Sequence, residues 1–445
     1  MWFVVSTDVN IFWHRRDLRI EDNAGLYHAL KSSAKVQPIF IFDKSILDKL
    51  EDDTDARVSF IHDSISALKA AYEAYGGDLW VYHGTAKEVF EKLLSQHTVK
   101  AVFTNRDYEP YARKRDQAIS SMLSKAGLSF HSYKDHVIFE GNEVLKKDGT
   151  PYIVFTPYKR RWLEKLTSRK VAARSFYLTA YPTHKYLSSL KKSKTSTKLI
   201  TLKKMGFKPT EIPIPSKEVK QSIIKKYAEQ RDYPAIQGTS RLGLHFRFGT
   251  ISIREKALKA QKLNDTFLSE LIWRDFYSQI LYHFPHVEQG AFRPKYDKIR
   301  WENNESHYER WTQGMTGYPL VDAGMRELNN TGHMHNRVRM VVASFLTKHL
   351  LIGWRWGEAY FALKLLDFDL ASNNGGWQWA AGCGTDAAPY FRIFNPTSQQ
   401  KKFDKELKYI KKWVPEWGTE AYPDPVVDHR EARERCLARY KEALQ

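Results

Sequence analysis

Residues 367–396, DFDLASNNGGWQWAAGCGTDAAPYFRIFNP, hold the densest group of side chains in this chain that could bind or transform a ligand. Two carboxylates, Asp367 and Asp369, can accept hydrogen bonds from hydroxyl or N–H groups, and the amide of Asn373 can both donate and accept. Two tryptophans that follow offer large π faces. Such a mixture suits a planar, hydrogen-bonding heteroaromatic cofactor, although a glycine-rich turn beside core tryptophans would have the same composition.

A second candidate binding segment comprises Tyr227 and the run QGTSRL at residues 237–242. It offers hydroxyls, backbone N–H groups and a guanidinium just ahead of a helical pattern, and these are the groups that hold a pyrophosphate. The alternative is an ordinary helix N-cap formed by Thr239 or Ser240.

The segment SELIWRDFY predicts a helix that carries Glu270, Trp273, Arg274 and Tyr277 on adjoining turns. A simple interpretation is an i,i+4 ion pair between Glu270 and Arg274 beside a core tryptophan. A functional interpretation needs support from the rest of the chain.

The charge balance points to a polyanionic partner. The 445 residues include 70 lysines and arginines against 51 aspartates and glutamates, which gives a net charge of +19 and a pI of about 9.5. Nucleic acid or an anionic membrane surface would both attract such a chain. No apolar run approaches the ~20 residues that a spanning helix needs, and the N-terminus lacks a signal-peptide pattern. We therefore expect a nucleic-acid partner, no membrane, and a cytoplasmic protein, or a nuclear one in a eukaryote.

Metal chemistry is not expected. Only two cysteines are present, Cys383 and Cys436, so one chain cannot build a disulfide framework or a four-thiolate metal or iron–sulfur site. The pair His333 and His335 lacks a third ligand nearby and is more typical of a structural or substrate-facing role.

Between about residues 9 and 133, short apolar runs alternate with helical periods such as the one through Ile61, Ile65 and Leu68. This alternation predicts an α/β, Rossmann-like domain with a parallel sheet and helices on both faces. No G-x-G-x-x-G follows the first strand, which excludes a nicotinamide dehydrogenase fingerprint. The expected strands are NIFWH, VQPIFIFD, DLWVYHG, KAVFTN and LSFHSY.

The rest of the chain divides into a connector and a helical part. Residues 134–220 form the expected connector, and their Lys- and Ser/Thr-rich stretch 188–208 predicts an exposed linker. From residue 221 to 445 the pattern becomes helical and rich in tryptophan, which predicts an all-α domain.

These motifs together resemble the photolyase/cryptochrome family, and within it the class I cyclobutane pyrimidine dimer photolyases. The resemblance runs from HRRDLRIEDNAGL at residues 14–26 to FNPTSQQKKFD at residues 394–404, so it covers nearly the whole chain. It implies an antenna-type α/β domain at residues 1–133, a connector at 134–220 and a helical FAD-binding catalytic domain at 221–445.

The resemblance implies that FAD is the cofactor and that the GTSR loop binds its diphosphate. Asn373 would face flavin N5, where an amide can rotate to meet either protonation state and favours the reduced flavin. Arg339 would pair with Asp367 beneath the flavin. The implied FAD-binding residues are Tyr227, Thr239, Ser240, Arg241, Leu242, Arg274, Asn336, Arg339, Asp367, Asp369 and Asn373.

The resemblance also implies that the substrate is a pyrimidine dimer in damaged DNA. Glu270 would hydrogen-bond the dimer, stabilise charge on the base C4 carbonyl and lend a proton. Photolyases that act on 6-4 photoproducts carry histidines at the positions of Asn336 and Met340, and neither residue here can shuttle a proton. Arginines would bind the backbone while tryptophans pack on the flipped bases. The implied substrate residues are Arg231, Glu270, Trp273, Asn336, Arg337, Met340, Trp379 and Arg392.

Three indoles, Trp377, Trp354 and Trp301, match the family's chain of tryptophans that passes a hole from the flavin to the surface. Trp356 and Trp311 show that not every tryptophan need belong to this chain. The implied catalytic residues are Glu270, Asn373, Trp301, Trp354 and Trp377.

The implied function is light-dependent DNA repair, in which reduced FAD excited by blue or near-UV light donates an electron to the dimer, the ring splits and the electron returns. A cryptochrome-like blue-light signalling protein is the main alternative, disfavoured by the short segment after FNPTSQQKKFD and by the repair-type pocket. A DASH-type cryptochrome restricted to single strands and a basic DNA-binding protein without cofactor are further alternatives. We expect a monomer.

The resemblance leaves room for a second, antenna chromophore, and a deazaflavin or a flavin fits better than a folate. The site could also be empty. The residues behind this expectation are Phe42, Asp43, Ile46, Leu47, Arg57 and the run NRDYEPY at residues 105–111.

Overall fold

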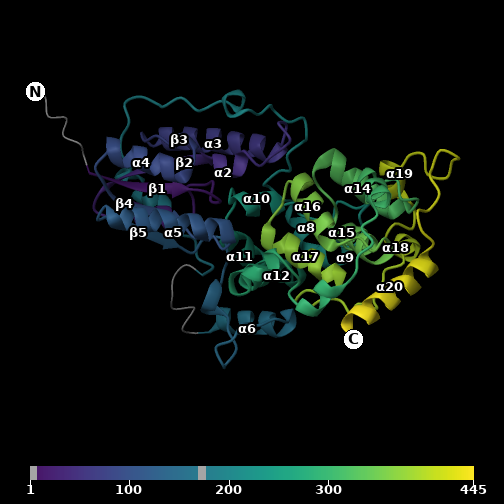
Figure 1. The fold of residues 1–445 in the computed structure, drawn as a ribbon. Helices are drawn as coiled ribbons and strands as arrows, with labels where there is room; N and C mark the ends of the chain where they lie inside the picture. The colour runs from purple at the N-terminus through teal and green to yellow at the C-terminus, as the bar shows by residue number, and fades with distance from the viewer. Residues whose placement is uncertain (1–7, 169–176) are drawn as a thin grey trace, which may run out of the picture. The chain divides into compact units, whose positions relative to one another are not determined.

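The computed structural model describes residues 8–168 and 177–445, and Figure 1 shows their helices and strands. The described chain divides into two compact units, each assembled from separate stretches of sequence. The boundaries of these units differ from the predicted domain boundaries at residues 133 and 220. Compact units need not coincide with functional domains, so the predicted boundaries stay a prediction. As far as they are described, the first unit comprises Met1–Glu140, Leu166–Lys217 and Leu242–Lys259, and the second comprises Gly141–Lys165, Glu218–Arg241 and Ala260–Gln445.

A five-stranded parallel sheet forms the centre of the first unit, with the strand order β3-β2-β1-β4-β5. Each strand coincides with one of the five apolar runs, so the predicted parallel sheet is confirmed. The order reverses at β1, because the chain adds β2 and β3 on one side and then β4 and β5 on the other. The strands are β1 (Val9–His14), β2 (Lys35–Asp43), β3 (Trp80–Gly84), β4 (Val99–Asn105) and β5 (Ser129–Tyr133).

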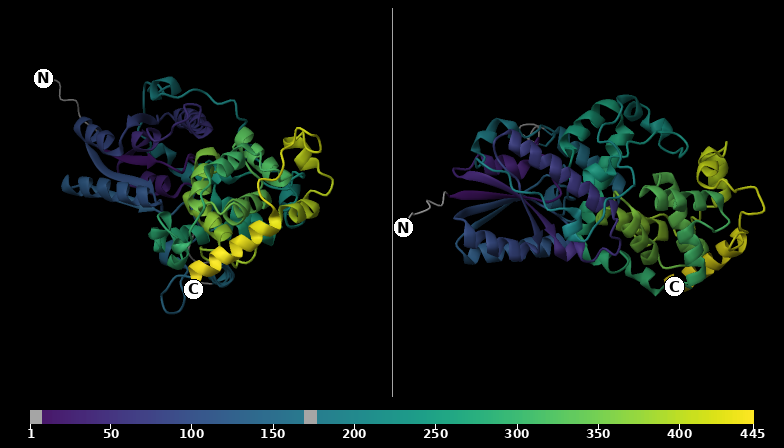
Figure 2. Two further views of the ribbon diagram at one scale, coloured as in Figure 1. Left: turned by 45° about the vertical axis from the view of Figure 1, so that its right-hand side comes forward. Right: turned by 90° about the horizontal axis from the view of Figure 1, so that it is seen from above.

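Helices cover both faces of this sheet, as the right-hand view in Figure 2 shows. Phe12 and Phe40 belong to the apolar cluster on one face, whereas Trp13 and Ile39 belong to the cluster on the other. Because both faces are buried, these strands are continuous apolar runs instead of alternating ones. The helices of this unit are α1 (Ala24–Leu30), α2 (Lys44–Leu47), α3 (Ala56–Ala74), α4 (Ala86–Gln96), α5 (Pro110–Lys125) and α10 (Gly243–Phe248).

The stretch 188–208 is exposed over most of its length, as its composition predicts, but three of its apolar residues attach it to the first unit. Leu190, Met205 and Phe207 are buried and belong to the apolar cluster that includes Phe12. The 3-10 helix η3 (Leu202–Met205) and a backbone hydrogen bond from Lys191 N to Val36 O, 2.8 Å long, attach the stretch to the first unit. The sequence did not indicate this attachment, because the apolar residues of the stretch are too widely spaced to show a period.

The second unit is helical, as the tryptophan-rich pattern predicts. Trp311, Trp354 and Trp377 lie in its main core together with Val338 and Phe345. Among the described helices, none has the length and apolar character needed to cross a bilayer. Its elements are η1 (Gly141–Glu143), α6 (Phe155–Thr167), α8 (Gln221–Lys225), α9 (Tyr227–Gln230), α12 (Asp265–His283), η4 (Pro285–Glu288), η5 (Pro294–Lys298), α13 (Glu305–Gln313), α14 (Pro319–Thr331), α15 (Asn336–Ser344), the π-helical turn η6 (Phe345–His349), α16 (Trp354–Lys364), α17 (Leu370–Ala381), α18 (Pro396–Phe403), α19 (Lys408–Trp413) and α20 (His429–Leu444), and α11 (Ile253–Leu263) runs into this unit from the first.

Candidate cofactor and substrate site

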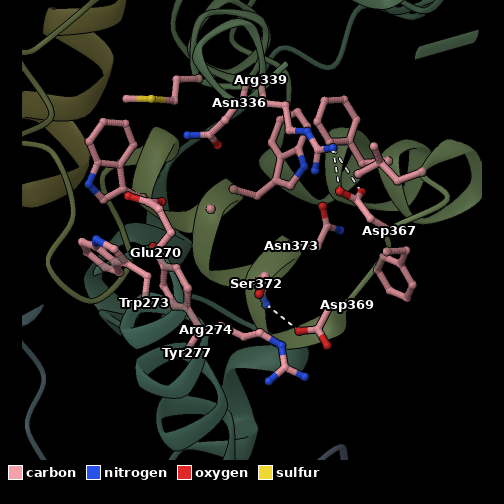
Figure 3. A pocket seen from close by; sticks show the side chains of 18 of the residues that line it. Glu270, Trp273, Arg274, Tyr277, Asn336, Arg339, Asp367, Asp369, Ser372 and Asn373 are labelled. Atoms are coloured by element: carbon pink, nitrogen blue, oxygen red, sulfur yellow. Dashed lines mark hydrogen bonds and ion pairs between the residues drawn. The ribbon is translucent and has the colours of Figure 1, made fainter. Parts of the chain in front are cut away.

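A cavity of about 430 Å³ opens in the second unit among α12, α15, α17 and residues 365–369 (Figure 3). Its volume lies in the range of sites that bind small molecules and cofactors. Most of the predicted site residues line it: Arg231, Glu270, Trp273, Arg274, Asn336, Arg339, Met340, Asp367, Asp369, Asn373, Trp377 and Trp379.

Helix α12 supplies one wall. Asn264 caps its N-terminus by accepting from Phe267 N at 3.0 Å, and buried residues on the opposite face fix the rotation of the helix. Positions i, i+3 and i+4 then place Glu270, Trp273 and Arg274 toward the cavity. The carboxylate of Glu270 accepts from Arg231 Nη1, a partner that the simple i,i+4 interpretation did not include.

One face of the Trp273 indole is already covered. The ring of Phe155 stacks on it with centroids 3.7 Å apart and an interplanar angle of 7°. A base could therefore pack only on the opposite face of Trp273, and this packing stays a prediction. Sequence alone could not place Phe155 here, because it is more than a hundred residues away along the chain.

Helix α15 begins at Asn336, with His335 as its N-cap. The ring Nδ1 of His335 accepts from Arg337 N at 3.2 Å, and burial lowers the pKa of His335 to about 4. A neutral imidazole can accept this bond, so the cap persists at neutral pH. The cap fixes the first turn of the helix, from which Asn336 and Arg339 reach the cavity.

The other histidine of the pair, His333, has a carboxylate partner. Its Nδ1 lies 3.5 Å from Oε1 of Glu327, and the same carboxylate accepts from His335 N at 3.2 Å. In the described part of the chain, no three His, Cys, Asp or Glu side chains gather as metal ligands would.

Arg339 and Asp367 form the predicted ion pair. Arg339 Nη2 lies 3.1 and 3.0 Å from the two carboxylate oxygens, and Arg339 Nε donates to Met334 O at 2.7 Å. Both side chains line the cavity, where Figure 3 shows the pair beside Asn373. Its position beneath a flavin stays a prediction.

The start of α17 orients Asn373. Asp369 caps the helix by accepting from Ser372 N at 3.2 Å, and Asn373 Nδ2 donates to the backbone carbonyl of Glu358 at 3.0 Å. The amide nitrogen is thereby fixed, which leaves Oδ1 to accept a hydrogen bond from a ligand. The rotation of this amide expected from the sequence would break its bond to Glu358. A Cβ on Gly375 would come within 2.2 Å of the Tyr277 ring, so glycine is required where the two helices approach.

Glu358 is a residue that sequence reasoning missed. Its Oε1 accepts from Asn374 Nδ2 at 2.8 Å, while its backbone carbonyl holds Asn373. Burial raises the pKa of Glu358 to about 7, although the hydrogen bond from Asn374 opposes this. No signal in the sequence marks it, because α16 and α17 must pack before these groups meet.

We expect Glu358→Gln to remove a pH dependence of stability. With a pKa raised from 4.5 to about 7, the folded protein retains a proton that the unfolded chain releases, so wild-type stability falls as pH rises through this window and levels off above it. The amide introduced by this substitution can still accept from Asn374 without becoming charged. At about pH 8 the variant should exceed wild type by about 1–3 kcal/mol.

Thermal or denaturant unfolding of the holoprotein between about pH 5 and pH 8 tests this. Glu420→Gln, which neutralises an exposed acid, is the matched control and should leave the wild-type profile unchanged. Parallel profiles for wild type and Glu358→Gln would contradict the expected titration of this carboxyl group.

The three predicted electron-transfer tryptophans lie beside or within the first turn of α16: Trp354 belongs to this helix, and the other two pack against glycines near its start. A Cβ on Gly357 would come within 2.0 Å of the Trp377 ring, and a Cβ on Gly353 would lie 3.6 Å from Trp301. Trp354 is the first residue of the same helix and is 4% exposed. The order Trp377, Trp354, Trp301 is thus the order along the helix, and Trp377 is the one of the three that lines the cavity.

The remaining predicted residues lie outside the lining of the cavity. A Cβ on Gly238 would come within 2.5 Å of Gln230, so the GTSR loop packs closely on the end of α9. Arg241 has a φ of 52° and lies 3.9 Å from Glu327. The residues concerned are Tyr227, Thr239, Ser240, Arg241, Leu242, Arg337, Arg392, Trp301 and Trp354. Lining residues without a predicted role are Tyr277, Ala343, Phe361, Leu365, Phe368, Ser372 and Gly376.

The residues present fit a flavin. Its planar ring needs apolar walls, which Trp377 and Phe361 supply, and hydrogen-bond partners at its polar edge. The free Oδ1 of Asn373 matches an N–H donor, and the ion pair of Arg339 and Asp367 places charged hydrogen-bonding groups in the cavity wall.

In the first unit, the residues expected around a second chromophore divide into two groups. Asn105 and Asp107 are buried and bind protein groups: Asn105 Nδ2 donates to Asp17 at 2.6 Å and Arg16 Nη1 to Asp107 at 3.1 Å. Ile46 and Tyr111 remain exposed, and Tyr111 donates to Asp43 at 2.7 Å.

Comparisons with known proteins assign the chain to a family. Residues 10–175 match the family model described as DNA photolyase, and residues 267–419 match that of the FAD binding domain of DNA photolyase. The deoxyribodipyrimidine photo-lyase of Synechococcus is 37% identical to this chain, with 97% of this chain and 96% of that protein covered.

Two solved structures extend the likeness to the fold. A bacterial class III photolyase from Agrobacterium tumefaciens has a TM-score of 0.84 at 33% identity, with 99% of each chain covered. An archaeal photolyase from Sulfolobus tokodaii, solved with two FAD molecules, has a TM-score of 0.82 at 36% identity, with 98% of this chain and all of that chain (100%) covered.

The chain belongs to the DNA photolyase family, within the photolyase/cryptochrome group that its motifs resemble. Its cofactor domain is that family's FAD-binding domain, so the predicted fold and FAD as cofactor are confirmed. The narrower assignment to class I stays a prediction, because the similar structures include a class III enzyme.

Proposed function

We propose that this protein is a light-dependent lyase that splits cyclobutane pyrimidine dimers in DNA. The observation that carries the proposal is a single cavity lined by Arg339, Asp367 and Asn373 as well as by Glu270 and Asn336. We assign the first three residues to the flavin, and Glu270 with Asn336 to a base of the lesion. Reduced FAD, when bound and excited by light, supplies an electron to the dimer and recovers it after the ring has split.

The side chains of this protein hold the substrate and manage its charge. In its protonated form, Glu270 can donate a hydrogen bond to the base carbonyl, stabilise the negative charge that develops there and lend a proton from its carboxyl oxygen. Asn336 adds an amide donor, while Met340 fills space without acid–base capacity. Because neither residue can move a proton to a hydroxyl or amine, the pocket suits ring splitting and not the chemistry of 6-4 photoproducts.

DNA is bound through its backbone and its flipped lesion. We assign Arg231, Arg337 and Arg392 to phosphates, and Trp379 with the uncovered face of Trp273 to the bases. A damaged dinucleotide stacks poorly and costs less to extrude than a normal pair, which contributes to selectivity.

Defined oligonucleotides test this function against its alternatives. Reduced holoprotein under blue light should split a single cyclobutane dimer in duplex and single-stranded DNA, and leave a 6-4 photoproduct intact. Repair of single strands alone would assign the protein to the DASH-type alternative. Absence of light-dependent splitting on any substrate, with flavin bound, would favour the cryptochrome-like signalling alternative.

We also propose that the protein acts as a monomer in the cytoplasm, or in the nucleus of a eukaryote, and that its first unit binds a flavin-type antenna chromophore. The two FAD molecules of the Sulfolobus tokodaii relative support the antenna proposal. Absorption spectra of chromophores released from the purified protein test it.

A further inference from the structure

Four charged side chains form a continuous row beside the cavity: Glu270, Arg231, Asp232 and Arg337. Arg231 Nη1 donates to Glu270, and Arg231 Nε lies 4.0 Å from Asp232 Oδ1. Arg337 Nη2 donates to that same Oδ1 at 2.8 Å. Two acids balance two arginines, so the row has no net formal charge where two phosphate-binding arginines are expected.

Arg337 is held in this row from two sides. Its guanidinium carbon lies 4.4 Å from the centroid of the Phe403 ring, which is a cation–π contact. Its Nη2 donates to the carboxylate of Asp232. The Arg337 side chain is 19% exposed and that of Asp232 is 39% exposed. The carboxylate is therefore the partner more open to solvent, where an approaching phosphate would meet it.

We propose that Asp232 is a specificity-determining residue, whose carboxylate occupies arginines that would otherwise bind the phosphates of undamaged DNA. The inference rests on the proposed function, because it takes a lesion in DNA as the substrate. A phosphate that reaches Arg337 must sit near a like-charged carboxylate or displace it, which lowers affinity for any DNA.

A flipped lesion offsets this cost, whereas undamaged DNA does not. When Glu270 takes up a proton from solvent and donates a hydrogen bond to the dimer, its carboxyl group leaves Arg231, and Arg231 becomes available to Asp232 or to a phosphate. Undamaged bases stay stacked and leave the Glu270 to Arg231 contact in place. The row thus couples base recognition at Glu270 to backbone binding at Arg337, and Asp232 connects the two arginines.

The variant Asp232→Asn tests this, because it keeps the size of the side chain and removes its charge. Binding of the holoprotein in the dark is measured on one duplex with and without a single cyclobutane dimer, at several salt concentrations. We expect undamaged DNA to bind about two- to fivefold more tightly than to wild type, with a salt slope steeper by up to about one. The affinity for lesion-containing DNA should increase less, so the ratio of the affinities for lesion-containing and undamaged DNA falls.

Glu229→Gln is the matched control, because it removes the same charge three residues earlier from a side chain that forms no ion pair within the described residues. Equal affinities of Asp232→Asn and Glu229→Gln for undamaged DNA would overturn the proposal. Weaker binding of Asp232→Asn to both duplexes would also overturn it, since Asp232 would then orient Arg337 for phosphate.

A double variant locates the effect. In an Arg337→Gln background, Asp232→Asn should lose most of its influence on undamaged DNA, and an undiminished influence would contradict the assigned pairing. Failure of the proposed function would appear separately, as wild-type protein that does not split dimers in light, because affinity for undamaged DNA is measured without any lesion.

Discussion

Trp354→Phe is expected to slow photoreduction of the bound flavin by about tenfold or more, while repair by chemically reduced protein stays at the wild-type level. Trp354 begins α16, between the glycines that pack against Trp377 and Trp301. Phenylalanine keeps an apolar ring at this buried position but is much harder to oxidise than indole. The variant should fold and bind FAD, and only photoreduction of the oxidised flavin, which draws an electron through the protein, should be slowed.

The measurement follows flavin absorbance under blue light from the oxidised state, and Trp356→Phe on the same helix is measured beside it to test the alternative route. A separate assay follows repair after chemical reduction. Equal photoreduction rates in wild type and Trp354→Phe would mean that electrons take another route. Aromatic neighbours for such a route exist: Trp311 lies 6.1 Å from Trp377, and Tyr308 lies 5.8 Å from Trp311 and 5.0 Å from Trp356.

Glu270→Ala is expected to lower the quantum yield of repair severalfold at saturating DNA, while FAD binding and light absorption are retained. Glu270 lines the cavity and is partly exposed, so its carboxyl group can reach a base there. Its removal takes away one charge-assisted hydrogen bond to the base carbonyl as charge develops. Saturating DNA is needed, because the same change frees Arg231 and alters binding.

Glu270→Gln separates the two roles of this side chain. The amide still donates a hydrogen bond but cannot lend a proton, so its yield should lie between those of wild type and Glu270→Ala. A wild-type yield in Glu270→Ala at saturating DNA would remove Glu270 from the chemistry and leave it only as the partner of Arg231.

Local periodicity was sufficient to predict the sheet of the first unit and the helix α12 that supplies one wall of the site. The five strands are continuous apolar runs because both faces of the sheet are buried, and the spacing within SELIWRDFY places Glu270 and Trp273 on one face of α12. The pairing of Arg339 with Asp367 followed from motifs shared with a family, not from spacing.

Contacts between distant segments could not be predicted from the sequence. Glu270 meets Arg231, a partner from another segment, and the stacking of Phe155 on Trp273 depends on how α6 packs against α12. Glu358 acquires its raised pKa only when α16 and α17 pack together. In each case the controlling quantity is burial or proximity created by tertiary packing, and no local pattern records it.

The central claim is that the electron which splits a dimer returns to the flavin. The most direct test is to count the dimers split per reduced flavin in an anaerobic sample without external reductant. Under blue light we expect many dimers to be split per flavin, none in the dark, and flavin that is still reduced at the end. One dimer per flavin with matching flavin oxidation, or equal splitting in the dark, would contradict this account.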